Sequence, residues 1–128
     1  MKNTGNKIWY PTTKRIESIN KLMIKKFRAT KAERFQVRSS SQIKQALKET
    51  KEFPGVIEDK AAILVRKLQY HPFASANRRT AYFAMNEFLW KNKKYALAKN
   101  KLKGKEFMGK IRRGELSHEQ IKKEISLI

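Results

Sequence analysis

One short stretch of the sequence combines a residue type suited to acid–base chemistry with residue types suited to holding phosphate. It reads His71-Pro72-Phe73-Ala74-Ser75-Ala76-Asn77-Arg78-Arg79. A histidine titrates near neutral pH and can serve there as a general base. The planar forks of Arg78 and Arg79 match the geometry of phosphate oxygens. The stretch therefore predicts a proton acceptor beside an anion-binding group.

The elements expected on either side of this stretch place it well for that chemistry. Apolar spacing predicts one helix over residues 56–70 and a second over residues 77–91. The loop thus ends at a helix N-terminus, where the first amides have no internal partners and the helix dipole is positive. We expect Asn77 to lie at the helix start, where an ordinary N-cap role and a phosphate-binding role are compatible.

The stretch also resembles the signature of the Fic/Doc family, most closely its Doc-like (death-on-curing) branch. That signature is histidine, any residue, phenylalanine, any residue, an acid, glycine or alanine, asparagine, glycine or lysine, and arginine. The residues that match it are His71, Phe73, Ala76, Asn77 and Arg79. Arg78 stands where Doc-like members carry lysine, and Tyr82 stands where AMP-transferring members have a further arginine. Ser75 replaces the acid that binds the metal.

The resemblance implies a role for each residue of the loop. His71 would deprotonate a hydroxyl of a target protein, and Phe73 would be a structural plug. The phosphates of ATP or another nucleoside triphosphate would be held by Ala76, Asn77, Arg78 and Arg79. Ser75 is a degenerate metal position, because Mg²⁺ prefers carboxylate and phosphate oxygens. Three outcomes stay open: a metal held by phosphates alone, a chemistry in which Arg78 supplies the missing positive charge, and binding without turnover.

By the same resemblance, the chain would be a protein kinase or AMP-transferase that moves a phosphoryl or nucleotidyl group to a target protein. A translation factor is the kind of target implied, and the chain would be the toxin of a toxin–antitoxin pair. The alternative is a catalytically impaired protein that binds nucleotide or nucleic acid through its basic surface.

The composition bears on partners and on location. The 128 residues include 31 basic and 11 acidic ones, for a net charge of +20. This charge favours polyanions such as nucleic acid, a ribosome or an acidic antitoxin, although solvated lysine faces would account for it equally well. The absence of cysteine and the presence of only two histidines exclude disulfides and argue against a multi-histidine zinc site. No apolar run or signal region is visible, so we expect a cytoplasmic protein without membrane contact.

The expected architecture is a single all-α domain over residues 1–128, with about six helices. Residues 1–10 are expected to be an irregular arm, anchored by Trp9 and Tyr10. Beyond the two helices that flank the loop, spacing predicts a helix over residues 13–29, and a second helix that is capped within Ser39–Ser41 and ends near Lys51. Another helix should stop near Gly114, and a last one should follow a capping box at Ser117. Residues 32–38 are expected to form a loop or small hairpin flap near the site. Trp90 and Tyr95 are expected to cover the end of the helix over residues 77–91.

Overall fold

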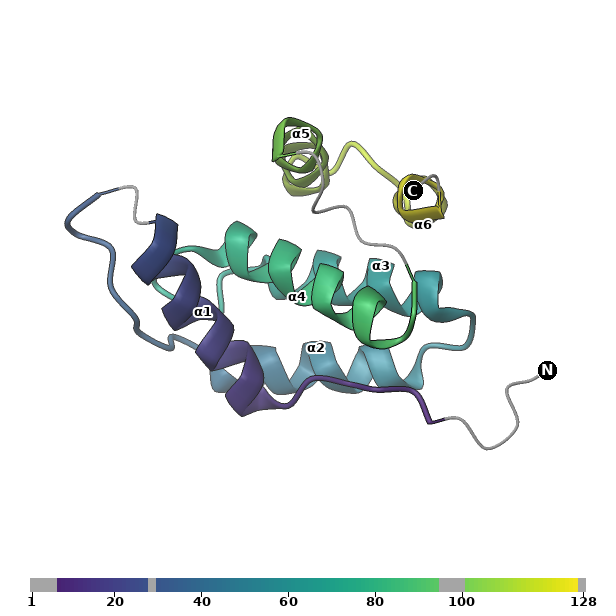
Figure 1. Ribbon diagram of the computed structural model, residues 1–128, viewed down its shortest axis with the longest axis horizontal. Helices are drawn as coiled ribbons and strands as arrows, with labels where there is room; N and C mark the ends of the chain where they lie inside the picture. Colours follow the sequence, from purple (N-terminus) through teal and green to yellow (C-terminus); the bar gives the residue numbers. More distant parts are fainter. Residues whose placement is uncertain (1–6, 28–29, 95–100, 127–128) are drawn as a thin grey trace.

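The computed structural model describes residues 7–27, 30–94 and 101–126, with side chains over 7–27, 30–94 and 103–125, and confirms the all-α prediction for them (Figure 1). Within these ranges the chain forms six helices and no strand. They are α1 (Thr13–Phe27), α2 (Ser40–Glu52), α3 (Ile57–Leu68), α4 (Asn77–Lys91), α5 (Lys101–Arg112) and α6 (His118–Ser126). No helix in the described ranges combines the length and the apolar character needed to cross a membrane.

The helix ends follow from local side-chain chemistry. Ser39 Oγ accepts a hydrogen bond from the Gln42 amide at 3.2 Å and begins α2. Before α6, the Ser117 amide donates to Gln120 Oε1 at 2.8 Å, and the Gln120 amide donates to Ser117 Oγ at 3.2 Å. Gly114 has a φ of +71° and follows the end of α5, a conformation that glycine adopts at low cost. These caps confirm the predicted starts of α2 and α6 and the predicted end of α5.

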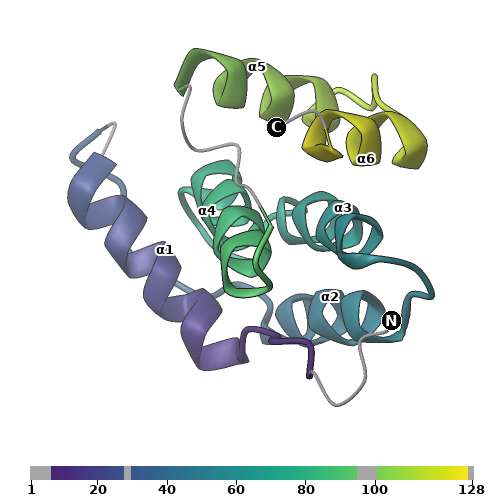
Figure 2. The same cartoon turned by 45° about the vertical axis from the view of Figure 1, so that its right-hand side comes forward.

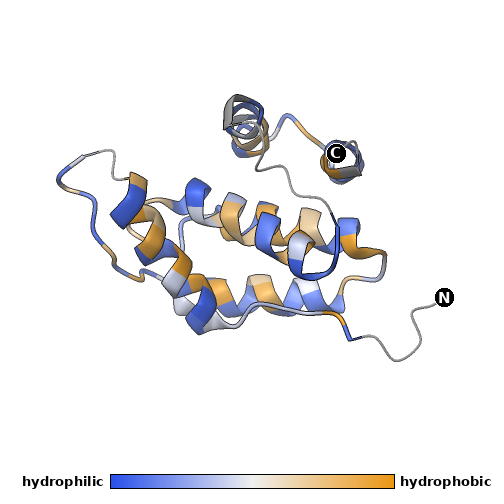
Figure 3. Cartoon of the chain, viewed as in Figure 1, coloured by the Kyte–Doolittle hydropathy of each residue, from blue (hydrophilic) through white to orange (hydrophobic). Residues whose placement is uncertain are grey.

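The core is centred on α3, which packs against α2, α4 and α6, while α1 covers α4. Most side chains of α3 are buried, so this helix contacts neighbours on nearly every side. Figure 3 shows the polar and hydrophobic segments that alternate along the outer helices, as expected for helices with one solvated face. The largest fully buried side chains on these helices include Ile16, Ile43, Leu64 and Phe88.

The last two helices lie together on one side of the α3–α4 pair (Figure 2). Helix α5 approaches α4 closely at Gly104, where a Cβ atom would lie 2.5 Å from the hydroxyl oxygen of Tyr82. Burial raises the pKa of the Tyr82 hydroxyl and outweighs the opposing hydrogen bond from Asn86. Tyr82 therefore packs between the two helices.

Helix α6 is attached to the start of α3 through Asp59. The Asp59 carboxylate accepts from the Val56 amide at 3.0 Å, lies 3.0 Å from His118 Nε2, and pairs with Lys122 Nζ at 3.3 Å. Burial of this carboxyl acts to raise its pKa, but the bonds from His118, Val56 and Lys122 together lower the pKa below its usual value. The carboxylate thus caps α3 and holds α6 against it.

A buried lysine closes the C-terminal end of α2. Lys60, on α3, is 7% exposed, and its ammonium donates to the carbonyls of Thr50, Lys51 and Phe53 at 3.3, 2.9 and 2.9 Å. These carbonyls have no intrahelical partners, and the helix dipole is negative there. A cation at this point therefore satisfies groups that would otherwise be buried without bonds. Nothing in the sequence distinguishes Lys60 from the many other lysines of the chain.

Two expectations about the aromatic residues have different outcomes. The arm is anchored as expected: the Trp9 amide donates to Asn92 Oδ1 at 2.9 Å, Asn92 Nδ2 donates to the Trp9 carbonyl at 3.0 Å, and the Tyr10 ring lies 5.9 Å from that of Phe88. The expectation that Trp90 covers the end of its helix is wrong, because its side chain is 69% exposed. Tyr95, the other residue of that expectation, lies outside the described residues.

Candidate active site

The loop between α3 and α4 turns the chain with two residues in the left-handed conformation. His71 has a φ of +60°, and Ala76 has a φ of +61° and a ψ of +29°. This conformation costs a non-glycine residue about 1–2 kcal/mol, so surrounding contacts must hold it. Ala76 has the smallest side chain that still has a Cβ, and α4 begins at the next residue. The backbone geometry thus depends on the bonds around this loop.

Asn77 makes most of those bonds. Its Oδ1 accepts from the Phe73 amide at 3.0 Å, and its Nδ2 donates to the Phe73 carbonyl at 2.9 Å. The side chain is buried, and both bonds cross the loop from its end to its middle. The side-chain amide of Asn77 therefore fixes the loop. The backbone N–H of Asn77, in the first turn of α4, takes no part in these bonds and is free to face an anion.

His71 is exposed and contacts the same amide. Asn77 Nδ2 lies 3.4 Å from His71 Nδ1, which is a long contact. Since Oδ1 of Asn77 is held by the Phe73 amide, Nδ2 can only donate, and this favours a lone pair on His71 Nδ1. In the neutral ring the proton then lies on Nε2. To accept a substrate proton at Nε2, the ring must first move its own proton to Nδ1, and because Nδ1–H would then face the Asn77 donor, the ring must also turn away from Asn77.

A segment from before α2 is paired with the loop. The amides of Arg38 and Ser39 donate to the Pro72 carbonyl at 2.8 and 3.0 Å, and the Ala74 amide donates to the Gln36 carbonyl at 2.9 Å. Within residues 30–39 no strand forms, so this segment is the expected loop rather than a hairpin. Within this segment Val37 forms an isolated antiparallel β-bridge with Phe73 of the motif loop.

Phe73 anchors this pairing on the protein interior. Its side chain is 1% exposed, and the ring of Phe35 lies 6.2 Å away. The ring belongs to the main hydrophobic core together with residues of α3 and α4. A buried ring in mid-loop leaves the backbone on either side of it little freedom.

Asn20, on α1, supports the loop from behind and was not identified from the sequence. Its side chain is fully buried, and Nδ2 donates to the Ser75 carbonyl at 2.9 Å and to Thr80 Oγ1 at 3.0 Å. Its Oδ1 has no hydrogen-bond partner among the described residues. The signal in the sequence was a polar residue within an apolar helix face, between Ile19 and Met23.

The two arginines of the motif have different surroundings. Arg78 is exposed and forms no ion pair with a described residue. Arg79 Nη2 pairs with Glu33 Oε1 at 2.8 Å, and its Nη1 donates to the Phe27 carbonyl. Arg78 is thus available to an anion in this structure, whereas both terminal nitrogens of Arg79, Nη1 and Nη2, are already bonded. No pattern in the sequence pointed to Glu33.

The start of α4 offers further donors. The first helical bond runs from the Thr80 amide to the Ala76 carbonyl at 2.9 Å, so the amides of residues 77–79 precede it. The first turn contains no acidic residue. These amides and the positive end of the helix dipole favour a phosphate group here.

The residues at this loop do not fit a magnesium ion held by the protein. Ser75 offers a neutral hydroxyl, and the nearby Oδ1 of Asn20 is buried and also neutral. Of the described residues, the group with metal-ligand spacing is Asp59, His118 and Glu119, at the other end of α3. Magnesium in proteins is bound through carboxylates and phosphates.

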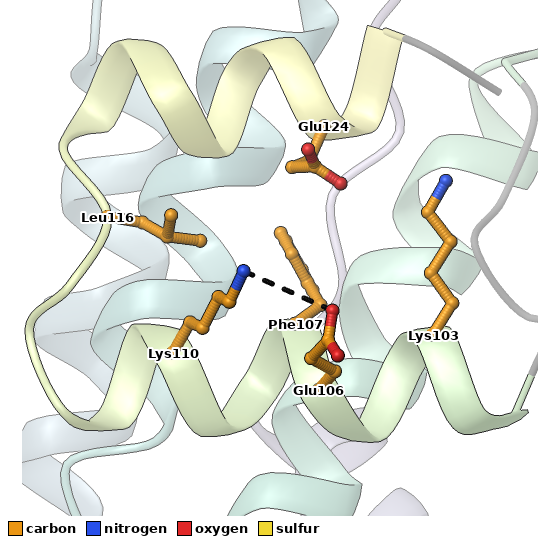
Figure 4. Close-up of a pocket in the computed structure, with 6 residues that line it drawn as sticks. All are labelled: Lys103, Glu106, Phe107, Lys110, Leu116 and Glu124. Carbon is orange, nitrogen blue, oxygen red and sulfur yellow. Dashed lines mark ion pairs between the residues drawn. The ribbon is translucent and has the colours of Figure 1, made fainter.

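A hollow elsewhere on the protein does not compete with the loop as a nucleotide site. It lies between α5 and α6, has a volume of about 100 Å³, and contains both charges, with Lys110 Nζ 4.0 Å from Glu106 Oε1 (Figure 4). Small-molecule pockets usually measure roughly 300–1,000 Å³. The residues around it are Lys103, Glu106, Phe107, Lys110, Leu116 and Glu124.

The model of the Fic/DOC family matches residues 10–89, more than half of the chain. The matched part runs from the N-terminal arm into α4 and includes the whole motif loop, whereas α5 and α6 lie beyond it. No curated protein matches the chain.

Proposed function

Because the chain belongs to the Fic/Doc family, we propose that it transfers a phosphoryl or nucleotidyl group from a nucleoside triphosphate to a hydroxyl of a target protein. The observation that carries this proposal is the position of His71. It is exposed, and it lies against Asn77 at the N-terminus of α4. A base and an anion-binding helix end are thus next to each other.

In the proposed reaction, His71 accepts the proton of the target hydroxyl as the oxygen attacks phosphorus. Attack at the α-phosphorus breaks its bond to the bridging oxygen and releases pyrophosphate, while attack at the γ-phosphorus releases the nucleoside diphosphate. Negative charge gathers on the phosphate oxygens in either case. The amides that begin α4 and the guanidinium of Arg78 are the donors that stabilise this charge.

A direct test separates the two forms of transfer. The protein is incubated with cell lysate and ATP labelled at the α- or the γ-phosphate. Label from α-labelled ATP alone indicates AMP transfer, and label from γ-labelled ATP alone indicates phosphoryl transfer. The His71→Ala variant should transfer neither, because a general base contributes about 10²–10⁴-fold to the rate. Equal labelling by a folded His71→Ala protein would contradict the proposal.

A second candidate is favoured by Ser75 and Arg79. The position of the family acid holds a serine, and Arg79, the arginine of the motif, is bonded to Glu33. Both features weaken catalysis, so the alternative proposal is a protein that binds a nucleotide without turning it over. Calorimetry that shows ATP binding, together with no label transfer from either ATP, would identify this function.

We also propose a biological role as a Doc-like toxin. The net charge of +20 suits an acidic antitoxin as the partner that silences it. Induced expression should then arrest growth, and the His71→Ala variant should not. A translation factor is the target class that the Doc-like resemblance implies, and the labelled lysate band would identify it.

A further inference from the structure

An exposed tryptophan lies in a basic cluster at the C-terminal end of α4. Trp90 is 69% exposed, more than any other large hydrophobic side chain among the described residues. Lys91 Nζ lies 5.8 Å from the Trp90 ring centroid and 5.7 Å from that of Trp9. We call Trp9, Trp90 and Lys91 the Trp–Lys cluster. The core does not account for Trp90, because most of this side chain faces solvent.

The backbone that presents this cluster is fixed. Asn92 bonds to both the amide and the carbonyl of Trp9, at 2.9 and 3.0 Å, and its Nδ2 donates to the Phe88 carbonyl at 2.8 Å. Trp9 packs against the hydrophobic core at its buried side. The two indoles are therefore carried by segments that are bonded to each other, although they lie just before and just after the matched region.

The surroundings of the cluster are positively charged and distant from the motif loop. Lys91, Lys93 and Lys94 are exposed, and the acid paired there is Glu58, 3.7 Å from Lys94 Nζ. The cluster is at the opposite end of α4 from Asn77. With a rise of 1.5 Å per residue, the 15 residues of α4 separate the two ends by about 20 Å.

We propose that the Trp–Lys cluster is a docking surface for single-stranded nucleic acid. A base stacks on the exposed face of Trp90, and the adjoining phosphates contact Lys91 and Lys93. An aromatic face accepts any base, and lysines that neutralise phosphates release condensed counterions, so this binding is tolerant of sequence and weakened by salt. An acidic protein partner would also contact the lysines and could pack against the indole, so the test below includes polyglutamate as a polyanion without bases.

The test is the binding of a fluorescein-labelled 12-residue oligouridylate, followed by anisotropy at low and at moderate salt. Trp90→Ala should weaken binding about five- to 150-fold, the range that loss of one stacked base produces. Lys91→Ala should weaken it and reduce the salt dependence. Tyr70→Ala and Lys25→Ala are the matched controls, since each removes an exposed side chain of similar kind from another surface. Both controls should bind as the native protein does.

Heparin separates stacking from simple charge attraction because it is a polyanion without bases. Trp90→Ala should bind heparin as tightly as the native protein does. The proposal is wrong if Trp90→Ala leaves oligouridylate binding unchanged, or if Lys25→Ala weakens that binding as much as Lys91→Ala. It is also wrong if the native protein binds polyglutamate but not oligouridylate, a result that would indicate an acidic protein partner. Melting followed by circular dichroism checks that each variant is folded.

Discussion

The carboxylate of Glu33 pairs with the guanidinium of Arg79 at 2.8 Å, across 46 residues of sequence. Their side chains are 16% and 29% exposed, so the pair is only partly hydrated. Arg79 matches the arginine of the family motif, and a phosphate that binds there has to displace Glu33. If the motif loop binds a nucleotide as we propose, Glu33 competes with its phosphate for Arg79.

Removal of this competitor should tighten nucleotide binding. Glu33→Ala is expected to lower the Kd for ATP about fivefold, since a pair of this exposure is worth about 1 kcal/mol. Arg79→Ala should raise the Kd instead. Isothermal titration calorimetry measures both. Glu49→Ala, which removes the partner of Lys67 on another face, is the control and should leave the Kd unchanged. Unchanged affinity in Glu33→Ala would show that Arg79 does not bind phosphate.

A carboxylate at position 75 should create the missing metal ligand. We expect Ser75→Asp to bind Mg²⁺–ATP more tightly and to transfer label faster than the native protein, because carboxylate is a preferred ligand of Mg²⁺. The Ser75 hydroxyl has no hydrogen bond to a described residue, so Ser75→Ala should behave as the native protein does. The measurement is the rate and the Kd as functions of magnesium concentration. A native protein that is already fully magnesium-dependent, and slowed by the substitution, would argue against this assignment.

Loss of the Asn77 side chain should loosen the loop. Asn77→Ala removes two bonds to the Phe73 backbone, and an unpaired buried amide or carbonyl costs about 1–3 kcal/mol. Hydrogen exchange at the Phe73 amide should become much faster in this variant. The Thr80 amide, bonded within α4, should keep its protection and serves as the internal reference. Equal protection at Phe73 in both proteins would show that Asn77 does not fix the loop.

We expect the protein to lose stability in acid because the Asp59 carboxylate becomes protonated. Its pKa is lower in the folded state, so its contribution is complete above the unfolded pKa near 3.8 and is lost as the pH falls through the folded value. The groups that face it are the His118 imidazole and the Lys122 ammonium, with the Glu119 carboxylate nearby.

Thermal unfolding between pH 6 and pH 2 checks this prediction. Asp59→Asn should be less stable than the native protein at pH 6, by about 1 kcal/mol, because a neutral amide can still accept from the Val56 amide but loses the ion pair with Lys122. The two should converge as the pH drops below about 4, because protonation removes the same charge from the native protein. A gap that stays constant across this range would exclude the carboxylate charge as its cause.

The ammonium of Lys60 should matter for stability alone. Lys60→Met leaves the carbonyls at the end of α2 without a donor, and we expect a loss of about 2 kcal/mol, as for hydrogen bonds to charged groups. Lys48→Met, at an exposed position of α2, is the control and should change stability little. Urea unfolding measures both variants. A stability of Lys60→Met equal to that of the native protein would contradict the role of the buried ammonium.

The structural features that depend only on residues close together in the sequence were predictable. The bounds of α4, the Ser39 cap and the capping box at Ser117 each arise from residues a few positions apart, and the structure confirms them. Trp90 was assigned wrongly because periodicity does not tell which side of a helix end meets another segment. Its exposure depends on where α4 ends relative to the arm.

Long-range contacts at the loop were not predictable in this way. The partners of Ser75 and Arg79 are Asn20 and Glu33, which come from α1 and the segment after it. Such pairings depend on the crossing of α1 over α4, which the pattern of either helix leaves undetermined. The roles assigned to His71 and its neighbours stay predictions that the variants above test.

The close approach of α5 to α4 makes the side chains that fit at positions 82 and 104 depend on each other. Tyr82 stands where AMP-transferring relatives have an arginine, and a side chain at Gly104 would collide with its hydroxyl group. An arginine at position 82 alone would therefore place a charged group at the space that Gly104 keeps open. We expect these two positions to covary among close relatives, so that exchange of one without the other is selected against, even though neither residue belongs to the motif loop.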